Sequence, residues 1–204
     1  MKGLLEHPRI YSLFRRLVGR DTARSVYARE HLRLAPGQRV LDLGCGPADI
    51  LQFLPEVEYV GYDINPAYIE RARRRFGHRG EFHCHGVDEN LSFPAGKFDV
   101  VIAHGVLHHL DDVAAGSLFR IARRALRPGG RLVTFDGCFV EGQAALARLF
   151  LVLDRGRHVR SREAYERLAR AEFDPVQSFV RHDLIRIPYT HLIMECGTAP
   201  PSRP

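Results

Sequence analysis

The chain has 204 residues, of which 45% are hydrophobic and 26% are charged, so it is long enough and apolar enough to bury one sizeable core. Arginines interrupt every early apolar run, and no run reaches the roughly 18 apolar residues that cross a bilayer, which argues against a signal peptide and a membrane span. The formal net charge of +6 is compatible with nucleic acid, anionic lipid or an acidic small molecule, and because it is diffuse it selects none of them.

Two helices are predicted at the N-terminus. The first spans about residues 8–18, where apolar residues recur at helical spacing on one face: Ile10, Leu13, Phe14, Leu17 and Val18. A basic amphipathic helix of this kind packs on its own domain or lies on a membrane surface, and we favour packing. The second helix is predicted from Asp21, a suitable N-cap, to about Leu32.

A glycine-containing stretch after the first predicted strand organises the rest of the chain. Residues 39–43 form a short apolar strand that carries Asp42, and Gly44 and Gly46 follow at once. Two glycines two residues apart let the chain turn sharply and bring bare backbone against a ligand. A helix is expected in the Ala48–Leu54 region, with its N–H groups directed at the loop. This pattern is typical of a nucleotide-type cofactor site.

An acidic residue follows the second predicted strand, residues 57–62. Asp63 comes 19 residues after Gly44, close to the spacing of about 20 at which a carboxylate meets ribose hydroxyls in such sites. Asn65 and Pro66 then suit the N-cap and the first position of a helix. The sequence therefore predicts a second contact to the same ligand beside the glycine loop.

Strands and helices alternate through the middle of the chain. Further strands are predicted near residues 81–85, 98–103 and 131–135, and helices near 66–76 and 112–126. This alternation gives a parallel sheet with helices on both faces. Ligands bind such sheets beyond the carboxyl ends of the strands. Six candidate residues are expected at those ends: Asp42, Gly44, Asp63, Asp88, His104 and Asp136.

The last third of the chain has a different pattern. Residues 140–153 and 162–171 favour helices inserted after the fifth strand, and residues 176–185 and 190–196 favour two strands. The four residues between these strands are too few for a crossover, so the strands are expected to be antiparallel. Residues 198–204, with three prolines, are expected to be a disordered tail.

Cysteines and neighbouring histidines were considered as metal ligands. The four cysteines show no C-x-x-C spacing and are expected to be buried, reduced thiols, which suits the cytoplasm: Cys45, Cys84, Cys138 and Cys196. His108 and His109, and likewise His83 and His85, have no third ligand at a metal-binding spacing. We therefore expect no metal.

Four motifs in this order resemble the class I methyltransferases that use S-adenosylmethionine. They are the glycine loop, Asp63, the Leu-His-His-Leu stretch at residues 107–110 and the Leu-Arg-Pro-Gly-Gly turn at residues 126–130, and the resemblance spans about residues 36–140. The Leu-His-His-Leu stretch is similar to the branch that methylates small molecules. The resemblance implies a Rossmann-like, doubly wound α/β fold whose seven mostly parallel strands take the order 3-2-1-4-5-7-6, with helices on both faces and an antiparallel C-terminal strand.

The resemblance also implies a division of one domain over residues 1–197. The parts are N-terminal capping helices (1–35), a cofactor-binding core (36–136), a helical insert or cap (137–175) and a C-terminal hairpin (176–197).

By resemblance, the cofactor is S-adenosylmethionine and its product S-adenosylhomocysteine. The residues implied to contact it are Tyr11, Asp42, Leu43, Gly44, Cys45, Gly46, Asp63, Ile64, Val87, Asp88, His104 and Gly105. Asp42 is implied to organise the loop and the methionine end, and Ala48 stands where the family has a third glycine. For adenine, either Asp88 enters the slot or a backbone N–H of this turn binds the base alone, and we favour Asp88.

Three histidines are candidates for a general base. An oxygen or nitrogen acceptor loses a proton as it is methylated, and histidine can take a proton near neutral pH. The candidates are His104, His108 and His158, and we favour His108 because its expected position needs no lid motion. The alternative is that proximity alone suffices and no base exists.

The acceptor is predicted to be a small molecule. Our hypothesis is that part of a basic stretch in the predicted insert meets an anionic group on it, the alternative being a solvated basic loop: Arg155, Arg157, His158, Arg160 and Arg162. A nucleic-acid methyltransferase usually carries an Asn/Asp-Pro-Pro-aromatic motif where this chain has residues 103–106, and a nicotinamide oxidoreductase would need a glycine at Asp49. These two functions remain the alternatives, in that order. We expect no nucleic-acid partner and no stable membrane insertion.

Overall fold

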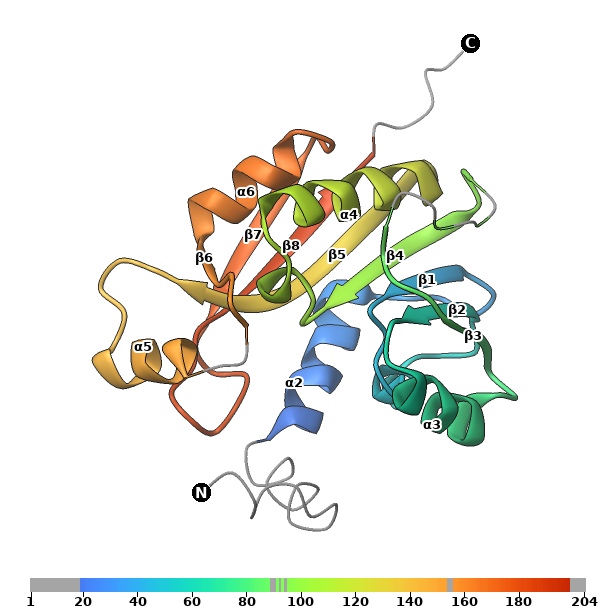
Figure 1. Ribbon diagram of the computed structural model, residues 1–204, viewed down its shortest axis with the longest axis horizontal. Helices are drawn as coiled ribbons and strands as arrows, with labels where there is room; N and C mark the ends of the chain where they lie inside the picture. The colour runs from blue at the N-terminus through green and yellow to red at the C-terminus, as the bar shows by residue number, and fades with distance from the viewer. Residues whose placement is uncertain (1–18, 89–90, 92, 94, 154–155, 199–204) are drawn as a thin grey trace.

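The computed structural model describes residues 19–88, 91, 93, 95–153 and 156–198, and a sheet lies at its centre (Figure 1). The strands are β1 (Arg39–Leu43), β2 (Glu58–Asp63), β3 (Gly80–Cys84), β4 (Phe98–His104), β5 (Leu126–Phe139), β6 (Arg160–Ser161), β7 (Val176–Arg181) and β8 (His191–Gly197). Their order across the sheet is β3-β2-β1-β4-β5-β8-β7, and β6 pairs with β5 off this path.

This strand order confirms the fold expected from the sequence. If the two-residue β6 is set aside, β7 and β8 are the sixth and seventh strands, so the order reads 3-2-1-4-5-7-6. Strands β1 to β5 run parallel, whereas β8 runs antiparallel to both β5 and β7. The connection between β7 and β8 therefore makes the predicted antiparallel hairpin.

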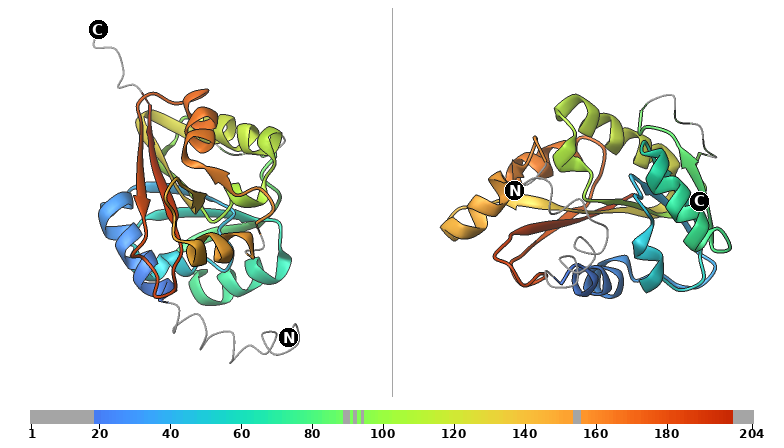
Figure 2. Two further views of the ribbon diagram at one scale, coloured as in Figure 1. Left: turned by 90° about the vertical axis from the view of Figure 1, so that its left-hand side faces the viewer. Right: turned by 60° about the horizontal axis from the view of Figure 1, so that its bottom comes forward.

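Helices cover both faces of the sheet (Figures 1 and 2). On one face lie α4 (Asp112–Ala125) and α6 (Arg162–Arg170); on the other lie α2 (Arg20–Tyr27), the π-helical turn η1 (Ala28–Leu32), the 3-10 helix η2 (Asp49–Phe53) and α3 (Pro66–Phe76). β4 shows why two layers are needed. Val101 packs with the α4 side and Ile102 with the α2 side, so the run at residues 100–103 of this strand is continuously apolar.

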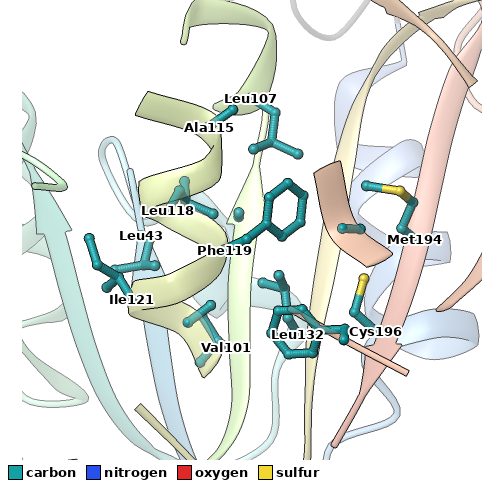
Figure 3. Packing of buried hydrophobic residues seen from close by; sticks show 14 of the residues in the cluster. Leu43, Val101, Leu107, Ala115, Leu118, Phe119, Ile121, Leu132, Met194 and Cys196 are labelled. Atoms are coloured by element: carbon teal, nitrogen blue, oxygen red, sulfur yellow. The ribbon is translucent and has the colours of Figure 1, made fainter. Parts of the chain in front are cut away.

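The core beneath α4 fixes the turn that precedes this helix. Figure 3 shows Leu118 and Phe119 of α4 in one apolar cluster with Leu107 and with the sheet residues Val101 and Leu132. All five side chains are fully buried. Burial of a side chain of this size stabilises the fold by about 1.5–3 kcal/mol. The 3-10 helix η3 (Leu107–His109) is thus anchored at its first residue.

Helix ends agree with the predictions at some positions and not at others. Asn65 caps α3, since its Oδ1 accepts the Ala67 N–H at 3.0 Å, as predicted. α2 begins at Arg20 with Gly19 as the N-cap, so the prediction of Asp21 as N-cap is wrong. The Asp21 carboxylate instead accepts from Arg24 within the first turn.

Three elements differ in length from their predictions. The helix after the glycine loop is only the five-residue η2. β5 is longer than predicted at both ends, and its register with β4 shifts between Phe98 and Val100. α5 (Ala145–Val152) is consequently shorter than the predicted helix 140–153, because the chain is still extended at Phe139 and turns at Gly142, where φ is +69°.

Some predicted features lie outside the described residues: the helix over residues 8–18 with Tyr11, and residues 199–204. Thr198, expected to begin the tail, is buried and donates its N–H to the Gly130 carbonyl. None of the helices in the described part of the chain is long and apolar enough to cross a membrane.

Candidate active site

The glycine loop after β1 has the strained geometry that its sequence predicts. Gly44, Gly46 and Ala48 adopt positive φ values of +79°, +54° and +54°. A Cβ on Gly44 would lie 2.5 Å from Val106 Cγ2, whereas a Cβ on Gly46 would meet nothing within 4 Å. Gly44 is therefore required by packing, and Gly46 faces open space that a ligand can fill.

Asp63, at the end of β2, holds this loop. Its Oδ2 accepts the Gly46 N–H at 2.8 Å and its Oδ1 accepts the Asn65 N–H at 2.8 Å. The N–H groups of Gly44 and Cys45 both donate to the Tyr62 carbonyl just before it. The end of β2 and the loop after β1 are thus one hydrogen-bonded unit, as their predicted adjacency requires.

Asp42 is a buried acid beneath the same loop. Its Oδ2 accepts the Tyr59 hydroxyl at 2.6 Å, while its buried Oδ1 has no hydrogen-bond partner within the described part of the chain. Burial raises the pKa of Asp42 from 3.8 to about 7; the Tyr59 hydrogen bond lowers it and the nearby Asp63 raises it further. An orphaned buried carboxylate oxygen is the kind of group that a bound ligand or ordered water satisfies.

Residues proposed for the adenine slot converge near Gly86. A Cβ built there would lie 3.8 Å from Ile64 Cδ1 and 3.7 Å from Asp88 Oδ2. Ile64 is 77% exposed, which is unusual for an isoleucine at the end of a buried strand. Val87 is half-buried and packs on the core. The structure therefore brings Ile64 and Asp88 to one place.

His104 and Gly105 end β4 in an aromatic environment. The His104 ring stacks on Phe135 at a centroid distance of 4.5 Å and meets the Tyr27 ring edge-on at 5.3 Å. Gly105 has φ +72° and donates its N–H to the Phe135 carbonyl at 2.7 Å. His104 is thus held on the α2 side of the sheet.

His108 and Asp136 form a buried pair on the other side. His108 Nδ1 lies 2.8 Å from Asp136 Oδ1, which also accepts the His108 backbone N–H at 3.2 Å. Burial raises the pKa of Asp136 above its ordinary value, and the hydrogen bonds from His108 lower it. With the carboxylate ionised, the imidazole proton sits on Nδ1 and the lone pair on Nε2. His108 lies in η3 rather than at the start of α4, which differs from its predicted place.

The basic stretch is divided among different roles. Arg160 is buried and donates to backbone carbonyls, and Arg162 pairs with Glu166 on the surface of α6. His158 and Arg157 have exposed side chains, and Arg155 lies outside the described residues. The structure therefore does not gather these residues into one cationic cluster.

Two contacts of the candidate site were not predicted from the sequence. Asp136 was placed at a strand end but was not linked to His108, and the strand-end position of an acid was the available signal. Arg160 was assigned to the acceptor, whereas its guanidinium is internal. No short-range pattern connects residue 160 to residues 107–110, because the pairing of β6 with β5 creates the contact.

The cysteines are unpaired, and two of the four differ from the prediction that all are buried. Cys138 and Cys196 are buried, Cys45 is half-buried beside Gly61, and Cys84 is exposed at the end of β3. No group of three or more histidine, cysteine or acidic side chains suited to a metal occurs among the residues that the structure describes.

The sequence of this chain is similar to those of known methyltransferases. Residues 40–130 match the family model described as a methyltransferase domain. The chain is 33% identical over 109 residues to a malonyl-[acyl-carrier protein] O-methyltransferase of Legionella pneumophila, covering 51% of this chain and 37% of that protein. It is 37% identical over 123 residues to a 27-O-demethylrifamycin SV methyltransferase of Amycolatopsis mediterranei, covering 56% of this chain and 44% of that protein. The matches thus span less than half the length of these relatives.

A solved structure shares the fold over almost the whole chain. The S-adenosylmethionine-dependent methyltransferase SibL superimposes with a TM-score of 0.73 and 23% identity, covering 98% of this chain and 60% of that one. The fold of this chain therefore has a counterpart among solved structures.

Proposed function

We propose that this chain, which belongs to the class I methyltransferases that use S-adenosylmethionine, transfers a methyl group from that cofactor to a small-molecule acceptor. When bound, the cofactor supplies a methyl group made electrophilic by a positively charged sulfur, so the protein mainly orients the reactants and excludes water. The observation that carries the proposal is the bond between the Gly46 N–H and the Asp63 carboxylate, which joins a glycine loop and a strand-end acid at one edge of the sheet.

The residues present fit this cofactor. Gly46 leaves open space at the loop, Asp63 presents a partly exposed carboxylate beside it, and the Oδ1 of Asp42 is an unmet buried acceptor. Ile64 and Asp88 offer an apolar surface and a polar edge suited to adenine. Leu43, Cys45, Val87, His104 and Gly105 complete the proposed contacts, and Tyr11 is proposed from the sequence alone.

Calorimetry tests the cofactor. We expect S-adenosylmethionine and S-adenosylhomocysteine to bind and NAD not to bind. Asp63→Ala should weaken S-adenosylhomocysteine binding by about 1–3 kcal/mol, because the ribose contact and the Gly46 bond are both lost. Arg162→Ala, on the surface of α6, is the matched control and should bind normally. Tight binding of NAD, or no heat with either cofactor form, would contradict the assignment of S-adenosylmethionine as the cofactor.

His108 is proposed as the general base for an oxygen or nitrogen acceptor. Asp136 holds the Nδ1 proton and so directs the basic Nε2 lone pair outward from the pair. Turnover of His108→Ala, measured at pH 7 with an acceptor found by screening lipid, sugar and aromatic compounds, should fall roughly 100-fold or more. Partial recovery at pH 9 is expected if the acceptor ionises by itself. Unchanged turnover at pH 7 would rule out His108 as the general base. His104 or His158 would then be the candidates, or proximity alone would suffice.

An anionic group on the acceptor is proposed to meet Arg157 rather than the whole basic stretch. Arg160 and Arg162 have internal or neighbouring partners, whereas the Arg157 side chain is exposed three residues before β6. Arg157→Ala should raise the Michaelis constant for the acceptor and leave cofactor affinity unchanged. An unchanged Michaelis constant would make the stretch structural.

We also propose that residues 1–197 act as one domain, divided as the sequence suggests, and that the protein works in the cytoplasm. The four unpaired thiols support this location. Fractionation of cells that produce the full chain would test it.

A further inference from the structure

We propose that Arg160 is a positioning residue that holds the His108 turn in place through its backbone carbonyls. This inference rests on the proposed role of His108 as the base. Arg160 lies 53 residues further along the chain than Leu107, yet its guanidinium sits against the turn that carries His108.

The guanidinium is fully engaged. Nη1 donates to the carbonyls of Leu107 at 2.9 Å and His158 at 3.0 Å, and Nη2 donates to the carbonyl of Leu110 at 2.6 Å. Nε and Nη2 both reach Asp112 Oδ1 at 2.8 Å. All five N–H groups of the guanidinium thus have acceptors. A side chain used in this way cannot also bind an anionic acceptor without giving up these bonds.

The turn is short, with three residues in η3. The Leu107 carbonyl accepts the Leu110 N–H at 3.2 Å within the turn, and Arg160 adds a second bond to it. Arg160 also binds the Leu110 carbonyl, at the end of the turn where a 3-10 helix leaves carbonyls without internal partners. The His158 N–H donates to the carbonyl of His108 itself at 3.0 Å. Three of the four carbonyls from residue 107 to residue 110 are therefore bound by the segment 158–160.

The chain just before this segment, at Gly156, also restricts the imidazole ring of His108. A Cβ on Gly156 would lie 2.2 Å from His108 Cδ2, so the glycine backbone packs directly on the ring. Asp136 fixes the opposite side through Nδ1. The ring is held between a backbone that only glycine permits and a carboxylate. Arg160 keeps this backbone close, because it is anchored in β6 against Cys138 and packs over the Tyr165 ring.

The ion pair with Asp112 is the weaker part of the arrangement. The Asp112 side chain is 80% exposed, and pairs of this kind contribute little. The carbonyl bonds are buried with Arg160, so they fix the turn. Asp112→Asn should consequently leave the position of His108 unchanged, whereas replacement of the Arg160 guanidinium should alter it.

The test uses the His108 imidazole itself as the probe, in the full chain with isotope-labelled histidine and without added ligand. In the wild type we expect a protected Nδ1–H signal that disappears in His108→Asn. In Arg160→Lys, which keeps the charge but cannot reach all the carbonyls, the Nδ1–H should exchange with water at least tenfold faster. Arg162→Ala and Asp112→Asn are the controls and should stay within twofold. Unchanged exchange in a folded Arg160→Lys, or equal acceleration in Asp112→Asn, would overturn the proposal.

A glycine variant keeps the test decisive if Arg160→Lys does not fold. Gly156→Ala should displace the ring and shift the same signal, whereas Gly116→Ala, where the nearest atom to a Cβ is 3.5 Å away at Arg120, should not. An unshifted signal in Gly156→Ala would show that the segment does not restrain the ring.

Turnover separates this proposal from the proposed function. If Arg160 acts through His108, Arg160→Lys alone should lower turnover. Combined with His108→Ala, it should lower turnover no further than His108→Ala does. The affinity for S-adenosylhomocysteine should be unchanged in both backgrounds. Faster exchange in Arg160→Lys with full turnover in His108→Ala would refute the base and keep the positioning. Loss of turnover in His108→Ala with unchanged exchange in Arg160→Lys would refute the positioning and keep the base.

Discussion

Beyond the carboxyl ends of β1 and β2, a loop is held by backbone N–H groups and one carboxylate from nearby parts of the chain, whereas the contacts beyond β4 and β5 depend on side chains from distant parts of the chain. Gly46 and Asp63, which join the first pair of strands, are 17 residues apart. His108 and Asp136 are 28 residues apart, and Arg160 reaches 53 residues back to Leu107. The difference separates the proposed cofactor region, fixed by turn geometry, from the proposed acceptor region, fixed by tertiary packing.

The largest effect is expected in the cofactor region, from Gly44→Ala. The substitution forces a Cβ to within 2.5 Å of Val106 at a φ of +79°, and valine has few rotamers with which to yield. Left-handed strain and overpacking together should lower the free energy of unfolding by about 2–5 kcal/mol. Urea unfolding measures this loss.

Gly46→Ala is the matched control for that experiment. Its φ of +54° brings strain, but nothing lies within 4 Å of the added Cβ. We expect a loss of only about 1–2 kcal/mol in stability, together with weaker S-adenosylhomocysteine binding. Equal stability losses in the two variants would show that Val106 moves aside and that Gly44 is not required by packing.

These two glycines also show what the sequence could and could not reveal. Gly44, Gly46 and Asp63 were recognisable because positive φ and strand-end carboxylates follow from residue type and spacing. The two-residue β6 carries no periodicity, so neither the Arg160 contacts nor the place of Gly156 over His108 could be predicted. The fold could be predicted because local and periodic signals agree along β1 to β5. The contacts of the proposed acceptor region could not be predicted, because they are long-range.

A second prediction concerns pH and the buried acid of the cofactor region. The folded-state pKa of Asp42 is raised to about 7, so between about pH 4 and pH 7 the folded chain holds a proton that the unfolded chain has released. Stability from this group is therefore present below pH 4 and is lost as the pH rises to 7. Asp42→Asn should remove this dependence and be more stable than the wild type at pH 8 by about 2–4 kcal/mol.

Unfolding curves at pH 5 and pH 8 measure this effect. Tyr59→Phe is a useful companion, because it removes the hydroxyl that lowers the pKa of Asp42 without removing the carboxylate. Its stability should fall further than that of the wild type between pH 5 and pH 8, because a still higher pKa of Asp42 extends the loss to higher pH. If the wild type and Asp42→Asn gave parallel pH profiles, Asp42 would be ionised throughout the range.

The smallest effect is expected on the outer face of α5, which packs on β5. Leu146 and Leu149 are each 50% exposed and Val152 is 65% exposed, whereas Leu151 is buried against Gly137. Leu149→Gln should change the free energy of unfolding by no more than about 0.5 kcal/mol, because it removes no buried contact. Leu151→Ala, two residues along the same helix, should cost about 2–5 kcal/mol and serves as the control.

Both variants are measured by urea unfolding and then by acceptor kinetics. A loss above 1 kcal/mol in Leu149→Gln would mean that this face already packs on the protein. A raised Michaelis constant for the acceptor at unchanged stability would instead place the acceptor on α5 and extend the acceptor region beyond the reach of Arg160.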